Sequence, residues 1–223
     1  MSRPETTPGS RYGRYVAFLG LVILVLLAVN TVVNKPGGIR GVEPGHRLPP
    51  FAVPLASGDL NGAANVAIHA NEGEAGHVPA CTVRGPQVLN ICQLYERGPV
   101  VLALFVDGGS CPRVLSEMQA LAPSFPGVHF AGVALEGQRG ELRALIRARN
   151  LTIPVGFDRD GVLAALYKVV SCAQLTFAYP GGVVQSKPLL EVPAPATLRA
   201  RVSELVQAAR ARGYRPTAAV NPP

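Results

Sequence analysis

Several residue types and motifs are scarce or missing in this sequence. The chain has 223 residues, no tryptophan, only four cysteines and 16% charged residues. The absence of tryptophan excludes any redox motif that needs this residue beside a cysteine. Four cysteines in a chain of this length also exclude a small scaffold held together mainly by disulfides. The histidines lack the spacing of a zinc site, and no glycine-rich loop carries the lysine of a phosphate site, so we expect no metal and no cofactor.

The residues that are present favour a folded chain near a membrane. Hydrophobic residues make up 48% of the sequence, which excludes disorder throughout, and the length fits one or two small domains. The formal net charge of +7 suits a protein at a membrane surface. The sequence shows no segment that combines basic and aromatic residues in the pattern typical of nucleic-acid binding. We therefore expect no nucleic-acid partner.

The longest apolar segment is residues 15–33. It is YVAFLGLVILVLLAVNTVV, 19 residues without a charge, and as a helix it spans about 28 Å, close to the roughly 30 Å of a bilayer core. Arg3, Arg11 and Arg14 precede it, with only Glu5 opposing them. This bias favours a single-pass helix in the cell membrane, with a cytoplasmic N-terminus and an extracytoplasmic body.

A cleaved signal peptide is the alternative for this segment. Cleavage needs small residues in an A-x-A-like pattern after a shorter apolar run, whereas this run ends Ala28-Val29-Asn30-Thr31. The pattern therefore favours an uncleaved anchor. Disulfides persist outside the cytoplasm, so the four cysteines could form two pairs there.

Composition and periodicity divide the chain into five parts. In order, these are a cytoplasmic tail (1–14), the transmembrane helix (15–33), a Gly/Pro-rich tether (34–50), a domain (51–212) with an insertion at about 69–92, and a flexible tail (213–223).

The regular pattern of the domain begins at residue 99. Residues 99–106, PVVLALFV, form a continuous apolar run that is typical of a strand buried on both faces. Ser110-Cys111-Pro112 predicts a helix start, because Ser is a capping residue and Pro suits the first helical position. Pro180-Gly181-Gly182 predicts a hairpin. The other predicted strands are 51–55, 65–68, 128–135, 153–157, 174–179 and 183–187, and the other predicted helices are 138–150, 162–167 and 197–212.

This order predicts an α/β fold in which a mixed sheet lies between helices. Within it, most of the arginines of the helix 138–150 (Arg139, Arg143, Arg147 and Arg149) are expected on a solvated face. His129 is expected in the core or at the edge of a strand, not as a catalytic base.

The order of elements, with a cysteine where the first helix of the domain begins, resembles the thioredoxin superfamily. More narrowly, it resembles the membrane-anchored extracytoplasmic thiol–disulfide oxidoreductases and the redoxins of the alkyl hydroperoxide reductase and thiol-specific antioxidant group. The resemblance covers about residues 48–212 and rests on the entry segment Leu48-Pro49-Pro50-Phe51, Cys111 just past a strand, Glu117 six residues later, residues 167–177, and the turn at Pro180. It implies a three-layer thioredoxin-like fold and exchange with protein thiols or disulfides, or with a membrane electron donor.

Three features depart from these families. Val114 stands where a Cys-x-x-Cys motif needs its second cysteine, which excludes ordinary dithiol exchange through that motif. Ala173 stands at the position of the family's cis-proline, and its bond is expected to be trans, because a non-proline cis bond costs about 3 kcal/mol. The peroxiredoxin motif Pro-x-x-x-Thr-x-x-Cys is missing, since Leu104 and Gly108 occupy its Pro and Thr positions.

Cys111 is the candidate nucleophile. A thiolate at a helix N-terminus is stabilised by the helix dipole, and Arg113 is close in sequence. In the fold that the resemblance implies, the loop with Cys172 lies against the start of this helix. Cys111 would then attack a partner disulfide and Cys172 would resolve the mixed disulfide. A permanent disulfide between the same residues is the alternative, as is a purely structural role for Cys111.

Cys81 and Cys92 are expected to form a local structural disulfide that closes the insertion. For the whole protein, three functions remain open. They are thiol–disulfide exchange or redox homeostasis through Cys111 and Cys172, a catalytically inactive binding or assembly module at the membrane, and a weak thiol peroxidase that uses Cys111 alone.

Overall fold

The computed structural model describes residues 10–33, 40–73 and 76–216, with the side chains of the first segment described at residues 13 and 15–26. The chain forms two compact units, residues 1–39 and 40–223. The first unit holds helix α1 (Ser10–Val33). Among the residues so described, no helix has an apolar stretch long enough to cross a membrane. Residues 1–9, 34–39 and 217–223, which belong to the predicted tails and tether, lie outside the described residues.

The second unit contains a mixed four-stranded sheet with the order β5-β4-β3-β6. Its strands are β3 (Val100–Val106), β4 (His129–Leu135), β5 (Val155–Asp158) and β6 (Ala173–Ala178). The first three are parallel, and β6 pairs antiparallel with β3. A separate antiparallel pair joins β1 (Ala52–Pro54) to β2 (Val88–Asn90).

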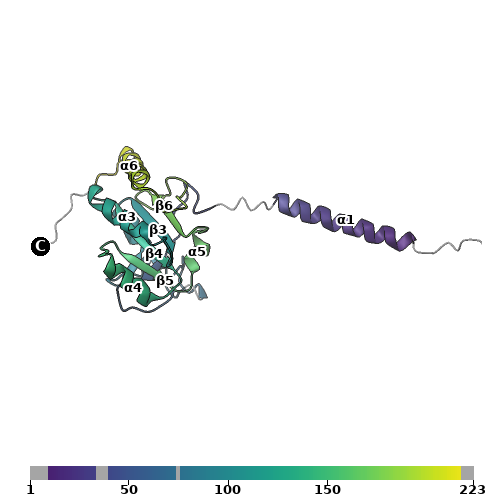
Figure 1. Cartoon of the computed structure of the whole chain (residues 1–223), viewed down its shortest axis with the longest axis horizontal. Helices are drawn as coiled ribbons and strands as arrows, with labels where there is room; N and C mark the ends of the chain where they lie inside the picture. The colour runs from purple at the N-terminus through teal and green to yellow at the C-terminus, as the bar shows by residue number, and fades with distance from the viewer. Residues whose placement is uncertain (1–9, 34–39, 74–75, 217–223) are drawn as a thin grey trace, which may run out of the picture. The chain divides into compact units, whose positions relative to one another are not determined.

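Helices lie on both faces of the larger sheet (Figure 1). They are α2 (Ile91–Arg97), α3 (Arg113–Leu121), α4 (Arg139–Ala148), α5 (Val162–Leu166) and α6 (Pro195–Ala211), with short 3₁₀ turns at η2 (Ala80–Thr82) and η3 (Ala122–Ser124).

The side chains of β3 alternate between two hydrophobic cores. Val101, Ala103 and Phe105 pack in the core that holds the buried residues of α3, α4 and α6. Leu102 and Leu104 point the other way, into the core that holds the buried residues of α2 and α5. The unbroken apolar run in β3 therefore covers two buried faces, and the predicted arrangement of a mixed sheet between helices is confirmed.

The helix after β3 begins later than its sequence predicts. Helix α3 starts at Arg113, its N-cap position is Pro112, and no side chain caps it. The predicted cap at Ser110 is therefore wrong. Cys111 instead lies in a turn, where its carbonyl oxygen accepts a hydrogen bond from the N–H of Val114. The N–H of Leu115 likewise donates to the carbonyl oxygen of Pro112, so the chain enters the helix through a tighter turn of i→i+3 hydrogen bonds.

The predicted hairpin forms, but residues 183–187 do not make a regular strand. Val184 forms an isolated bridge with Ala178, and pairing resumes only between Leu175 and Leu189. The register shifts by two residues between these two bridges, so no continuous ladder forms. The predicted strand 65–68 is likewise reduced to one bridge, between Ala52 and Asn65.

The described part of the predicted tether, residues 40–50, packs on the second unit. The N–H of Gly41 donates to the carbonyl oxygen of Lys168, and the N–H of Leu48 donates to that of Gly182. The hydroxyl of buried Tyr167 donates to the carbonyl oxygen of Pro49 at 2.6 Å. The unit therefore begins at residue 40, ahead of the predicted boundary at residue 51.

Two arginines of α4 hold a loop, so the predicted solvated face is wrong for them. Arg139 donates to the carbonyl oxygens of Leu55, Ala56 and Leu60, and Arg143 donates to those of Ala56 and Gly58. An arginine side chain has several N–H donors, so it can bind several backbone carbonyl oxygens at once. The two arginines thereby provide hydrogen-bond donors for the carbonyl oxygens of this irregular loop.

Candidate redox site

The pairing of β3 with β6 brings two distant cysteines together. Because these strands are antiparallel, the C-terminal end of β3 lies beside the N-terminal end of β6, with Phe105 opposite Ala173. Cys172 immediately precedes β6, and its carbonyl oxygen accepts a hydrogen bond from the N–H of Val106 at 2.9 Å. Cys111 follows β3 after a short turn, so both residues reach the same edge of the sheet.

Cys111 and Cys172 are joined in a disulfide with a Cα–Cα distance of 5.5 Å across 61 positions of sequence. This distance lies in the ordinary range for a disulfide. The turn before Cys111 contains Gly109 at φ +56°, a conformation that glycine adopts without steric cost. In the loop before β6, the hydroxyl of Ser171 donates to the carbonyl oxygen of Ala173 at 2.8 Å, which orders the chain around Cys172.

The two cysteines differ in burial. Cys111 is 8% exposed, and the next residues of α3 that face the sheet, Val114 and Leu115, are fully buried. Cys172 is exposed to solvent. Cys172 is therefore the more accessible of the two residues to an external thiol.

Arg149, just after α4, supports the turn that carries Cys111. Its Nη1 donates to the carbonyl oxygen of Pro112 at 2.9 Å and to the hydroxyl of Ser116 at 3.4 Å. Arg113, which the sequence places beside Cys111, is exposed. Sequence reasoning missed Arg149, because nothing local connects it with a residue 37 positions away.

An apolar groove of about 510 Å³ opens beside the disulfide. Both cysteines line it, and its apolar side chains are Val106, Leu135, Ala164, Val169 and Val170. Val106 and Val170 are 46% and 57% exposed, so the groove presents apolar side chains to solvent. Glu136 is the carboxylate among the groove residues.

A buried carboxylate lies deeper in the same part of the domain. Asp158, at the end of β5, accepts a hydrogen bond from the N–H of Leu163 at 2.7 Å and so caps α5. Burial raises the pKa of Asp158, and hydrogen bonds from Leu163, Val162 and Gly161 partly oppose this rise. Its role is to hold α5, which supplies Ala164 to the groove. Within the described residues, no three His, Cys, Asp or Glu side chains gather as a metal site requires.

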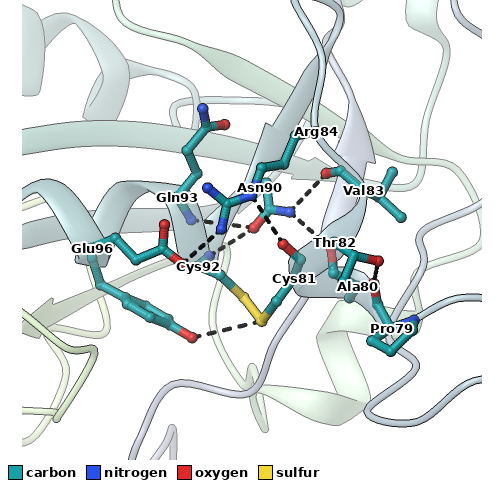
Figure 2. Close-up of polar contacts among 11 residues, drawn as sticks. Pro79, Ala80, Cys81, Thr82, Val83, Arg84, Asn90, Cys92, Gln93 and Glu96 are labelled. Carbon is teal, nitrogen blue, oxygen red and sulfur yellow. Dashed lines mark hydrogen bonds and ion pairs between the residues drawn. A yellow bond between two sulfur atoms is a disulfide. The ribbon is translucent and has the colours of Figure 1, made fainter.

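Cys81 and Cys92 form a second disulfide, with a Cα–Cα distance of 5.4 Å (Figure 2). It links η2 to α2, a helix that sequence reasoning missed. Asn90 caps this helix by accepting from the N–H of Cys92 and that of Gln93, and its Nδ2 donates to Ala80 and Val83. The signal for α2 was this Asn at a capping position before an apolar turn. Cys92 is only 1% exposed, which favours a structural role for this bond.

Comparisons with known proteins identify the fold. No protein-family model and no curated protein matches the sequence. A solved structure of a proposed protein disulfide isomerase from Bacteroides thetaiotaomicron has a TM-score of 0.56 and 13% identity, covering 79% of this chain and 99% of its own. A proposed thiol:disulfide interchange protein DsbE from Chlorobium tepidum has a TM-score of 0.53 and 17% identity, covering 75% and 98%.

A peroxidoxin, BcpB, from Mycobacterium tuberculosis matches with a TM-score of 0.52 and 14% identity, over 76% of this chain and 97% of its own. The domain has the thioredoxin-like fold. Its Cys111–Cys172 disulfide joins the turn before α3 to the loop before β6. All described peptide bonds of this thioredoxin-like domain are trans, which confirms the expectation for Ala173.

Proposed function

We propose that this protein carries out thiol–disulfide exchange through the Cys111–Cys172 pair, with protein thiols or disulfides as its substrates. The observation that carries the proposal is the bond itself, which lies at the edge of the sheet with one exposed cysteine and an apolar groove beside it. A disulfide that is accessible to an incoming thiolate can exchange, whereas one that is sealed in the core cannot. The thioredoxin-like disulfide oxidoreductases of similar fold are in keeping with this chemistry.

The groove supports a polypeptide substrate. Its apolar lining suits an unfolded or extended chain that presents cysteines among apolar residues. The same groove could serve a binding module without turnover, so the reactivity of the disulfide decides between the two functions.

The reduction potential of the Cys111–Cys172 bond tests the proposal. The full chain, equilibrated in glutathione and dithiothreitol redox buffers, should show a potential above about −300 mV, as redox-active pairs do. Reduction of insulin by dithiothreitol should be accelerated by the parent, and the acceleration should be lost in Cys111→Ser and Cys172→Ser. A potential below about −300 mV, with equal negligible rates in all three proteins, leaves the binding module.

A peroxidase activity needs its own assay. Peroxide consumption by Cys172→Ser, which retains Cys111 as a free thiol, separates that chemistry from exchange. We expect no consumption above that of the Cys111→Ser/Cys172→Ser protein.

We infer further that residues 15–33 anchor the protein in the cell membrane, with the redox domain outside the cytoplasm. The support is the uncharged run in the sequence and the arginines that precede it. Membranes from expressing cells should retain the full chain after alkaline carbonate extraction, and Leu21→Arg/Leu24→Arg should release it.

Labelling tests the side of the membrane. After reduction of intact cells, a membrane-impermeant maleimide should modify Cys172, while a cytoplasmic control protein stays unmodified. Labelling that requires lysis would place the domain in the cytoplasm.

A further inference from the structure

The two ends of the redox disulfide face different surroundings. Cys111 is 8% exposed, and it is followed by buried Pro112 and by Val114, which is fully buried. Cys172 is exposed and follows Val170, which is 57% exposed. The disulfide therefore joins a buried residue to an exposed one.

The difference in burial between Cys111 and Cys172 affects which of them an incoming thiolate can reach. In thiol–disulfide exchange the incoming thiolate approaches one sulfur from the side opposite the other, so that three sulfurs lie nearly in line. Cys111 is a buried residue next to Val114 and Leu115 of α3, so an incoming thiolate has little room to reach it. Cys172 is an exposed residue of the loop before β6, so a thiolate can approach it from solvent.

We propose that Cys172, not Cys111, is the residue that forms the mixed disulfide with substrate. Cys111 is then the leaving and resolving sulfur. This rests on the proposed exchange function and reverses the roles that the sequence alone suggests for the two residues.

The bond changes balance for one oxidative turnover. A thiolate of a substrate dithiol attacks Sγ of Cys172, the Cys111–Cys172 bond breaks, and Cys111 leaves as a thiolate. The second substrate thiolate attacks the substrate sulfur of the mixed disulfide and releases Cys172 as a thiolate. The substrate dithiol has been oxidised to a disulfide, and the protein disulfide has been reduced to two thiols. The two protons lost by the substrate thiols equal the two taken up by Cys111 and Cys172. The reverse sequence reduces a substrate disulfide through the same intermediate.

The surroundings of Cys111 suit a leaving group. It lies in the turn immediately before α3, next to the positive end of the helix dipole, which favours a thiolate. A thiol of lower pKa leaves faster from a disulfide. Arg149 holds the carbonyl oxygen of Pro112, so this turn keeps its place when the bond opens.

Both cysteines line the groove, and two of its exposed apolar residues lie near Cys172 in the structure or the sequence. The N–H of Val106 donates to the carbonyl oxygen of Cys172, and Val170 lies two residues before Cys172. These two valines are the most exposed apolar residues of the groove. A peptide with an apolar residue next to its cysteine would contact these side chains while its sulfur reaches Cys172. Val170→Asp should slow reaction with such a peptide more than reaction with glutathione, which is too small and polar to use the groove.

Mapping the first adduct tests the assignment. The oxidised full chain is mixed with reduced glutathione and quenched at short times with N-ethylmaleimide, and peptide mass spectrometry then locates both labels. We expect glutathione on Cys172 and N-ethylmaleimide on Cys111, in at least about tenfold excess over the opposite arrangement. The Cys111→Ser/Cys172→Ser protein controls for adducts on Cys81 or Cys92.

Two single variants provide a second measurement. Cys111→Ser should accumulate a stable mixed disulfide with a model cysteine peptide disulfide, and Cys172→Ser should accumulate at least about tenfold less in the same time. Circular dichroism and thermal melts check that both remain folded. Adducts predominantly on Cys111 would overturn the assignment and leave the exchange function intact. Failure of both cysteines to react, with the bond intact throughout, would overturn the exchange function as well.

Discussion

Arg149 donates a hydrogen bond from Nη1 to the carbonyl oxygen of Pro112, at 2.9 Å. This contact ties the end of α4 to the turn that carries Cys111. The two segments are far apart in sequence, so only the packing of α4 and α3 on the same face of the sheet brings them together.

Arg149→Ala should therefore loosen the turn before α3. We expect a loss of about 1–2 kcal/mol in the free energy of unfolding, because a hydrogen bond from a charged donor is removed. Hydrogen exchange should become faster at the N–H groups of residues 113–116. Arg147→Ala is the matched control, since the side chain of this exposed arginine makes no hydrogen bond within the described residues, and it should change stability by less than about 0.5 kcal/mol.

Asn90 should be important for the stability of the region around the Cys81–Cys92 disulfide. Its side chain accepts from two N–H groups and donates to the carbonyl oxygens of Ala80 and Val83, at 2.8 and 2.7 Å. Asn90→Ala should cost about 2 kcal/mol or more in urea unfolding, because a cap and two buried partners are lost.

Asn90→Asp separates the two roles. It keeps the acceptor for the helix cap but turns a carboxylate oxygen toward two carbonyl oxygens, so it should destabilise at least as much as Asn90→Ala. Gln93→Ala serves as the neighbouring control. An Asp variant as stable as the parent would show that the donor bonds contribute little.

The Cys81–Cys92 bond should stabilise the folded domain and take no part in thiol–disulfide exchange. Cys81→Ala/Cys92→Ala should lower the free energy of unfolding by about 3 kcal/mol, the loop-closure value for a sequence separation of 11. The reduction potential of Cys111–Cys172 should stay the same in this variant. A change in that potential with unaltered stability would contradict a structural role.

His129 should make the domain less stable in mild acid. Burial lowers its pKa, and the positive charge of Arg97 lowers it further, against a hydrogen bond with the Arg97 backbone. The folded state therefore binds the proton more weakly than the unfolded state, whose pKa is near 6.5. Stability is unaffected above that pH and falls as the pH drops from about 6.5 to the lower folded pKa.

Urea unfolding at pH 7.5 and pH 5.5 measures this effect. The parent should lose more stability between the two values than His129→Gln, whose side chain does not titrate. Equal losses in both proteins would mean that other groups cause the acid sensitivity.

Residues 99–106 show which elements a sequence predicts well. A run of apolar residues that covers two buried faces is a strong local signal, and β3 formed nearly where it was expected. The same holds for β4, α4 and α6, each with its own apolar periodicity. The start of α3 was misplaced, the short helix α2 was missed, and the strand predicted at residues 183–187 did not form as a regular strand, because turns and short elements depend on partners elsewhere in the fold.

The sequence by itself determined the alternation of strands and helices, the uncharged run at residues 15–33, and the absence of a second cysteine at position 114. These properties depend on residue type and local spacing. Only the tertiary structure decided which cysteine is buried, which arginines bind backbone carbonyls, and where the apolar groove lies. Those properties depend on how antiparallel β3 and β6 align their ends and on what packs around each side chain, which no local pattern encodes.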